Sequence, residues 1–275
     1  MIKKCVLPVA GLGTRFLPFT KVIPKELLPI YSKPLIEYAI DEAVQSEILD
    51  FVVVINKNKE AIVDYLSPNN NLDQIVRSTH KENLLTEINK IINKCSFSYI
   101  YQETMSGLGD AISYGKKNVN SEPFAVILPD DLCHSNAKSV LAQMIDIHLL
   151  YPDHSIVAVE EVDNKEVEKY GVIEGEIVDK AKQIYHVRSM VEKPSSNEAP
   201  SNLAIIGRYI LQPEIFNALE NIDADKNGEK QITDALKILA SKNKVLALKF
   251  SGTRLDCGSI DGFIEANNFF KQIYK

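Results

Sequence analysis

The sequence predicts a Rossmann-like α/β fold with three layers, in which helices flank a mixed, mainly parallel β-sheet. Two observations predict this fold. Through the first half of the chain, short apolar runs such as FVVVI (residues 51–55) alternate with helical patterns. The chain also has 275 residues, of which 45% are hydrophobic and 25% charged, so it is long enough to bury a full core.

The order of these patterns predicts the individual elements. A first strand, KCVLPV (residues 4–9), precedes a helix that begins at Pro34, because Leu35, Ala39 and Ala43 recur four residues apart. Ligands of such sheets bind beyond the carboxyl ends of the strands, so the loops that follow strands are the first candidates for function. Further strands are expected at residues 51–55, 97–101, 124–128, 155–162, 170–174, 183–193, 203–211 and 244–250. Further helices are expected at residues 61–66, 83–92, 110–116, 231–240 and after residue 258.

Composition excludes several classes of protein. The net charge of −6 argues against a nucleic-acid partner, because proteins that bind nucleic acids present clustered positive charge. No apolar run is long enough for a signal-peptide core or a membrane span. The cysteines form no Cys-x-x-Cys pair, which argues against a zinc site or a disulfide framework and favours reduced thiols. We therefore expect a cytoplasmic protein without a membrane partner. The four cysteines are Cys5, Cys95, Cys133 and Cys257.

The loop after the first strand, Ala10-Gly11-Leu12-Gly13-Thr14-Arg15, can form an anion cradle. Glycines let the backbone approach a ligand closely, and the N–H groups of such a turn can bind phosphate. The loop is no dinucleotide fingerprint, which would need glycine at Phe16, and the chain has no P-loop motif. Taken alone, these residues favour a tight turn with a solvated Arg15.

The next segment supports a phosphate site. Lys25 follows Pro24, and Pro18 and Pro29 stiffen the surrounding chain. A rigid loop can aim a lysine at phosphate oxygens as a compact point charge, and Arg15 can bind the same phosphates in a bidentate manner.

The stretch AGLGTRFLPFTKVIPKELLP (residues 10–29) resembles the signature of bacterial UTP–glucose-1-phosphate uridylyltransferases, which belong to the sugar nucleotidyltransferases. The resemblance implies a single nucleotidyltransferase domain over residues 1–275, of the glycosyltransferase-A-like type. Its nucleotide-binding half would span about residues 1–135 and its sugar-binding half about 136–275. The similarity continues in order through QETMSGLGDAI, PFAVILPDDL, KYGVIEG, VEKP, APSNLAIIGRYIL, QITDAL and DCGS.

The resemblance implies a nucleotide site built from two loops. Gln102 and the backbone near Gly107 would read the uracil, since an amide offers both a donor and an acceptor. Ala10 and Gly11 would cover the base. From the residues alone, a surface glutamine beside a helix-entry turn is the simpler interpretation. The remaining nucleotide-binding candidates in the first loop are Gly13 and Thr14.

A magnesium site is expected where the strand FAVIL ends. Asp130 and Asp131 follow Pro129, and carboxylates there are well placed to hold Mg²⁺, which prefers oxygen ligands. The resemblance implies that Asp130 binds Mg²⁺, that Asp256 is the second carboxylate and that Asp131 is a neighbour. The alternative for Asp256 is a helix N-cap, because a helix is expected just beyond it.

The motif VEKP (residues 191–194) is expected to bind the sugar phosphate. The resemblance implies that Glu192 bonds sugar hydroxyls and that Lys193 meets the phosphate of glucose 1-phosphate. Adjacent strand residues normally point to opposite faces, so an exposed pair is the alternative, but the alternation is easily broken at a strand end before proline. Gly171 would let the backbone approach the sugar. Asn202 is a further candidate, with a turn residue as its alternative.

The expected reaction joins UTP and α-D-glucose 1-phosphate to give UDP-glucose and pyrophosphate. Arg15, Lys25 and Lys193 are the expected catalytic residues and Mg²⁺ the cofactor, because charge neutralisation is the first requirement when two anions react. The closest alternative is the same chemistry with dTTP or another sugar. A non-catalytic sugar-nucleotide-binding regulator and an NAD-dependent dehydrogenase are further alternatives; the incomplete glycine fingerprint disfavours the last. A homo-oligomer, a dimer or a tetramer, is expected.

Overall fold

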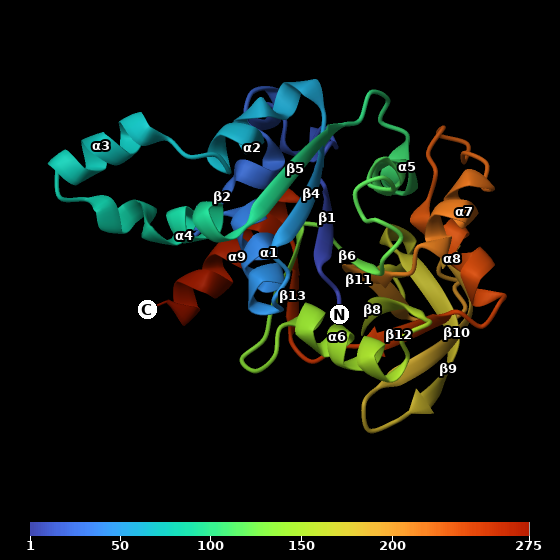
Figure 1. Cartoon of the computed structure of the whole chain (residues 1–275). Helices are drawn as coiled ribbons and strands as arrows, with labels where there is room; N and C mark the ends of the chain where they lie inside the picture. The colour runs from blue at the N-terminus through green and yellow to red at the C-terminus, as the bar shows by residue number, and fades with distance from the viewer. Residues whose placement is uncertain (275) are drawn as a thin grey trace.

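A nine-stranded sheet runs through the computed structural model, which describes residues 1–274 (Figure 1). The strand order is β5-β4-β1-β6-β11-β8-β12-β10-β9. Two small sheets, β2-β3 and β7-β13, lie beside it. The strands of the large sheet are β1 (Lys4–Pro8), β4 (Asp50–Ile55), β5 (Ser96–Tyr101), β6 (Phe124–Ile127), β8 (Ser155–Glu161), β9 (Gly171–Asp179), β10 (Ile184–Glu192), β11 (Leu203–Leu211) and β12 (Val245–Lys249). Those of the small sheets are β2 (Pro29–Ile30), β3 (Lys33–Pro34), β7 (Asp131–His134) and β13 (Thr253–Asp256).

The sheet is mixed. Strands β5, β4, β1 and β6 are parallel to one another, which confirms the expectation for the first half of the chain. In the second half only β8 and β12 are parallel, while β11 and β10 pair antiparallel with their neighbours. The parallel character is therefore weaker than expected. The physical reason is that β9 and β10 form a hairpin, which needs no crossover helix.

Helices cover both faces of the sheet, as expected for three layers. Helices α1, α2, α4 and α6 pack on one face, and α5, α7 and α8 pack on the other. Figure 1 shows α1, α2 and α4 on the left and α5, α7 and α8 on the right, with α3 projecting away from the body. None of the helices within residues 1–274 is both long and apolar enough to span a bilayer. The helices are α1 (Leu35–Gln45), α2 (Glu60–Tyr65), α3 (Asn70–Ser78), α4 (Thr86–Lys94), α5 (Gly107–Tyr114), α6 (Val140–Leu150), α7 (Glu214–Glu220), α8 (Ile232–Ala240) and α9 (Ile260–Ile273).

Successive side chains of each strand point alternately into two hydrophobic cores, one on each face of the sheet. Cys5 and Leu7 of β1 belong to the core that includes α1 and α6, whereas Val6 between them belongs to the core that includes α5 and α8. This alternation follows from the two-residue period of a strand. Strand β11 is buried along its whole length, so the centre of the sheet is covered on both faces.

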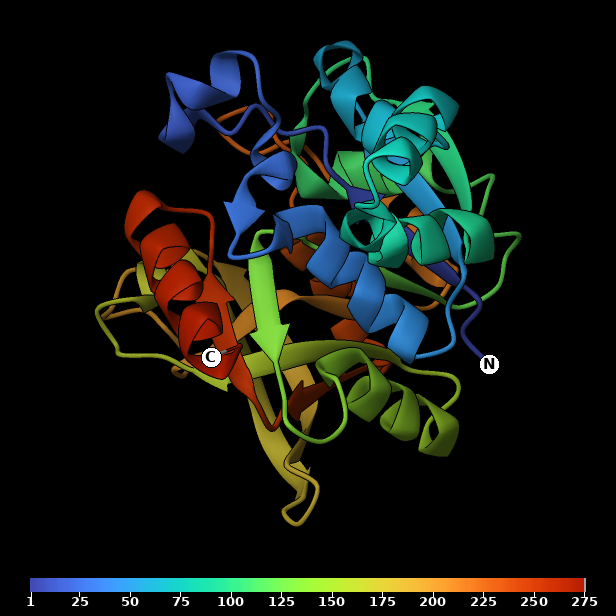
Figure 2. The same cartoon turned by 90° about the vertical axis from the view of Figure 1, so that its left-hand side faces the viewer.

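A third core lies beside the large sheet. Leu132 of β7 and Leu255 of β13 pack against Ala266 and Phe270 of α9. Figure 2 shows α9 (red) alongside β7 (green) at the edge of the molecule. This packing fixes the β7–β13 pair, in which Asp131 is the register partner of Asp256.

Candidate active site

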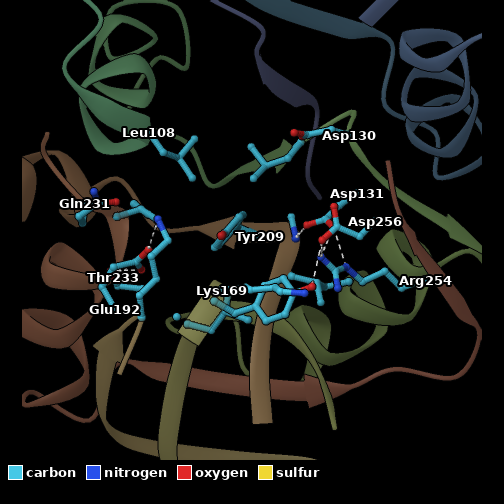
Figure 3. Close-up of a pocket in the computed structure, with 18 of the residues that line it drawn as sticks. Leu108, Asp130, Asp131, Lys169, Glu192, Tyr209, Gln231, Thr233, Arg254 and Asp256 are labelled. Carbon is cyan, nitrogen blue, oxygen red and sulfur yellow. Dashed lines mark hydrogen bonds and ion pairs between the residues drawn. The ribbon is translucent and has the colours of Figure 1, made fainter. Parts of the chain in front are cut away.

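A cavity of about 680 Å³ opens beside β7 and β13 (Figure 3). Asp130 reaches it from the loop after β6, Gly171 from the start of β9 and Glu192 from the end of β10. Tyr209 of the central strand β11 also lines it. Segments far apart in the sequence thus meet at one hollow.

Lys25 and Asp130 form an ion pair at this edge of the sheet. Lys25 begins a short 3₁₀ helix (Lys25–Leu27) directly after Pro24, and its Nζ lies 2.5 Å from Asp130 Oδ2. Burial alone would lower the pKa of Lys25, but the carboxylates of Asp130 and Glu26 outweigh burial and raise it. Burial would raise the pKa of Asp130, but Lys25 outweighs it and lowers that pKa below its ordinary value. Both groups are therefore charged at neutral pH.

Arg15, Asp130 and Asp256 converge around Gly258. Arg15 Nη1 donates to the Gly258 carbonyl oxygen over 3.3 Å. A Cβ atom on Gly258 would lie 3.0 Å from Asp256 Oδ1 and 3.6 Å from Asp130 Oδ2. Two carboxylates and a guanidinium group thus surround one bare stretch of backbone.

A second cluster joins Asp131, Glu160 and Asp256 through Arg254. The Arg254 guanidinium contacts Asp131 Oδ1 at 2.5 Å and Glu160 Oε1 at 2.7 Å. Asp131 Oδ2 accepts a 2.7 Å hydrogen bond from Gly207 N. Burial raises the pKa of Asp131, and Arg254 offsets part of this effect. Arg254 was not predicted from the sequence, although it lies two residues before Asp256 on one strand, a spacing that places both side chains on the same face.

The sugar-side candidates meet at the ends of β9 and β10. Glu192 Oε2 accepts a 2.9 Å hydrogen bond from Thr233 Oγ1. A Cβ atom on Gly171 would lie 2.5 Å from Thr233 Cγ2 and 3.2 Å from Glu192 Oε2, so only glycine fits there. Lys193 has a φ of 46°, a left-handed conformation that breaks the alternation of the strand. Its Nζ lies 3.4 Å from Glu192 Oε1, so both side chains face the cavity that they line.

Residues 4–273 match the family model for nucleotidyl transferases. This chain belongs to the nucleotidyl transferase family. A UTP–glucose-1-phosphate uridylyltransferase of Pseudomonas aeruginosa is 48% identical to it over 100% of this chain and 98% of that protein. One of Staphylococcus epidermidis is 40% identical over 96% of this chain and 90% of its own length. A solved UDP-glucose pyrophosphorylase complexed with UDP-glucose is 50% identical, with a TM-score of 0.92 over 99% of both chains.

In this nucleotidyl transferase the first loop lies beside the cavity rather than on its wall, except for Arg15. The Ala10 carbonyl oxygen accepts a hydrogen bond from Asn56 Nδ2. Gly13 has a φ of 65°, and a Cβ atom on Gly11 would have no atom within 4 Å. The backbone at Gly11 is thus open to a ligand. Thr14 lines a neighbouring hollow of about 520 Å³.

Gln102 is buried, with 5% of its surface exposed, so the alternative of a surface glutamine is wrong. Its Nε2 donates to Asp110 Oδ2 over 2.7 Å, which holds the amide in one orientation. Gly107 begins α5 with a φ of 92°, and a Cβ atom there would lie 2.9 Å from the Lys230 carbonyl oxygen. Both conformation and space therefore require glycine.

Asn202 is the one sugar-side candidate that does not line the cavity within residues 1–274. Its side-chain Nδ2 donates to the Val162 backbone carbonyl oxygen over 3.3 Å. Its backbone carbonyl oxygen accepts a hydrogen bond from Val162 N. The structure thus shows Asn202 pairing with the chain after β8, directly before β11.

A buried ion pair that was not predicted from the sequence involves Glu26, the residue next to Lys25. Lys59 Nζ contacts Glu26 Oε2 at 2.6 Å, with 5% and 2% of the two side chains exposed. The pair joins the 3₁₀ helix that carries Lys25 to the loop after β4. No local pattern in the sequence indicates that these two residues meet.

Proposed function

We propose that this chain transfers the uridylyl group of UTP to glucose 1-phosphate, giving UDP-glucose and pyrophosphate. The observation that carries the proposal is the 48% identity, over the full chain, to a protein named for this reaction. The charges of the cavity support it. Arg15 and Lys193 line the cavity from two separate segments, and Lys25 pairs with Asp130 at its edge, so cations are available for two phosphate esters.

In the proposed mechanism, a phosphate oxygen of the sugar attacks the α-phosphorus of UTP in line. Lys193 neutralises the sugar phosphate, while Arg15 and Lys25 draw charge onto the leaving pyrophosphate. The attacking oxygen is already ionised at neutral pH, so positioning and charge stabilisation are sufficient. In agreement with this mechanism, none of the described residues that line the cavity is a histidine.

We further propose that Asp130 and Asp256 hold Mg²⁺. No group of three or more metal-binding side chains occurs within residues 1–274, and Mg²⁺ commonly binds one or two carboxylates together with substrate phosphates. The two carboxylates fit this pattern because both lie close to Gly258 and open to the cavity. The bound ion would neutralise charge on the reacting phosphates. Lys25, which pairs with Asp130, would then share that carboxylate with the ion.

The uridine and glucose groups are assigned to opposite sides of this centre. Gln102 and the backbone at Gly107 would read the uracil, with Ala10 and Gly11 over the base and Gly13 and Thr14 completing the loop. The fixed amide of Gln102 and the open backbone at Gly11 support this assignment. Glu192 would bond sugar hydroxyls beside Gly171, whose missing side chain leaves space for the Thr233 side chain that holds Glu192.

The test is pyrophosphate release from the purified protein mixed with Mg²⁺, UTP and glucose 1-phosphate. We expect turnover that needs all three. The same assay with dTTP and with other sugar 1-phosphates measures the closest alternative, because a methyl group on the base contributes only about 1–3 kcal/mol of discrimination. A protein that binds UDP-glucose but releases no pyrophosphate would be a regulator, and the proposed reaction would be wrong.

We also propose a cytoplasmic homo-oligomer, a dimer or a tetramer. The four free cysteines support a reducing compartment. Helix α3 supports assembly, because Leu72 and Ile75 are 41% and 51% exposed on a helix with no buried residue. Light scattering on the purified protein measures the number of subunits, and a monomer at working concentration would contradict assembly.

A further inference from the structure

Arg254 lies between three carboxylates at the wall of the cavity. Its Nη2 is 2.5 Å from Asp131 Oδ1 and 3.3 Å from Asp256 Oδ2, and its Nη1 is 2.7 Å from Glu160 Oε1. The side chain is 6% exposed. Figure 3 shows the Arg254 guanidinium directed at Asp131 and Asp256 together. Neighbouring carboxylates repel each other, and this guanidinium contacts both of them and so holds them side by side.

Both oxygens of the Asp256 carboxylate are engaged. Oδ1 accepts a hydrogen bond of 3.0 Å from Gly258 N. Oδ2 accepts one of 2.9 Å from the Tyr170 hydroxyl group and also meets Arg254. The Asp256 side chain is nevertheless 37% exposed and lines the cavity. Its orientation is therefore fixed while it stays open to a ligand.

Tyr170 reaches both sides of the cavity. Its ring centre lies 4.7 Å from the Arg254 guanidinium carbon, and its hydroxyl group donates to Asp256. Its backbone carbonyl oxygen accepts a 3.0 Å hydrogen bond from Lys193 N, and Gly171 follows it directly. Tyr170 thus connects the Asp256 carboxylate on one wall of the cavity with the opposite wall, where the ends of β9 and β10 carry the sugar-side candidates.

We infer that Tyr170 and Arg254 are positioning residues, which orient Asp256 toward the divalent ion and connect it to the strand end carrying Lys193. The inference rests on the proposed function, because it requires the ion. Neither residue needs to contact the reacting phosphates. Partners that orient a metal ligand typically change metal affinity about 10–100-fold when they are removed.

Tyr170→Phe tests the inference, because it removes the hydroxyl group and keeps the ring on Arg254. The measurement is the binding of Mn²⁺, used as a probe for Mg²⁺, to the full chain saturated with UDP-glucose, followed by electron paramagnetic resonance. We expect affinity at least tenfold weaker than in the wild type. The Mg²⁺ concentration for half-maximal turnover should rise by a similar factor, while the KM for glucose 1-phosphate at saturating Mg²⁺ stays within about twofold.

Tyr65→Phe is the matched control, because Tyr65 also donates its hydroxyl hydrogen to a carboxylate, that of Glu37, but outside the cavity. It should bind Mn²⁺ as the wild type does. Unchanged Mn²⁺ affinity in Tyr170→Phe would overturn the role of Tyr170. Arg254→Lys keeps the positive charge but loses the planar guanidinium group that contacts several carboxylates at once. Unchanged Mn²⁺ affinity in that variant would overturn the role of Arg254. A wild-type chain that binds no Mn²⁺ with UDP-glucose would instead overturn the metal site itself.

Discussion

Lys25 Nζ lies 2.5 Å from Asp130 Oδ2, although 105 residues separate the two in the sequence. The pair joins the loop after β1 to the loop after β6, which are neighbouring parallel strands. Because parallel neighbours end at the same edge of a sheet, loops that are distant in sequence meet there. The pair therefore depends on the sheet topology and assembles only when both strands are in place.

The Lys25–Asp130 pair predicts a defined pH dependence of stability. It lowers the pKa of Asp130 below the ordinary value of 3.8, so its stabilising effect is complete above pH 3.8 and is lost as the pH falls through the native pKa. Lys25 stays charged throughout this range, because its pKa is raised. In Lys25→Met we expect the free energy of unfolding at pH 7 to fall by about 1.5–3 kcal/mol, as for a lost hydrogen bond between charged groups.

Urea unfolding of both proteins from pH 7 down to pH 3 measures the effect. The difference between wild type and Lys25→Met should shrink on the acid side as Asp130 becomes protonated in both. A constant difference across the whole range would show that Asp130 is not the group responsible. Lys21→Met is the control, because Lys21 is exposed and has no carboxylate partner among the described residues.

Lys193→Ala should lower turnover by about 10²–10³-fold, the usual loss when one charge-stabilising group is removed. The fold should survive, since the Lys193 side chain is 54% exposed and pairs only loosely with Glu192. Pyrophosphate release gives the rate, and circular dichroism checks the fold. Lys182→Ala serves as the matched variant on the exposed β9–β10 turn and should keep full activity. A near-normal rate in Lys193→Ala would remove Lys193 from the catalytic residues.

Gly171→Ala should affect the sugar substrate selectively. The new methyl group would lie 2.5 Å from Thr233 Cγ2, so Thr233 has to move and with it its hydrogen bond to Glu192. We expect a tenfold or greater rise in the KM for glucose 1-phosphate and about 1–3 kcal/mol less stability, as for other overpacked sites. Steady-state kinetics measure both constants. The KM for UTP is the internal control and should stay within about twofold of the wild-type value. Equal changes in both constants would contradict the assignment of Gly171 to the sugar.

Arg208→Met should destabilise the fold without changing the chemistry. Arg208 is 2% exposed and donates to Glu42 Oε2 from Nε at 3.0 Å and from Nη2 at 2.8 Å, which joins β11 to α1. Removing one partner of a buried ion pair leaves an uncompensated charge and costs about 3–5 kcal/mol. Thermal unfolding should show this loss. Glu42→Gln with Arg208→Met should recover part of it, and a double variant as unstable as the single one would contradict the argument.

The sequence predicted those features that depend on local pattern. The strand FVVVI became β4, and the helix expected after Pro34 became α1, because β-branched runs and four-residue spacing act within a few residues. The region 83–92 was predicted as one helix, but it divides into a 3₁₀ turn (Glu82–Leu85) and α4. Within residues 82–94 only Ile91 is buried, so little packing supports a continuous helix there.

The remaining features depend on contacts between distant segments. Arg254 meets Asp131 and Glu160 across separations of 123 and 94 residues, and nothing in the GTRLDCGS stretch shows which carboxylates it will find. Helices α3, α6 and α7 were not predicted. Strand β11 was predicted as a strand, but its run of apolar residues does not reveal that it occupies the middle of the sheet.

The central position of β11 has a consequence for how the chain is made. Its neighbours β6 and β8 both precede it in sequence, so each presents an unpaired edge to the cell until residue 211 has left the ribosome. Until β11 emerges, a partly synthesised chain would leave these two edges open, and exposed strand edges favour aggregation.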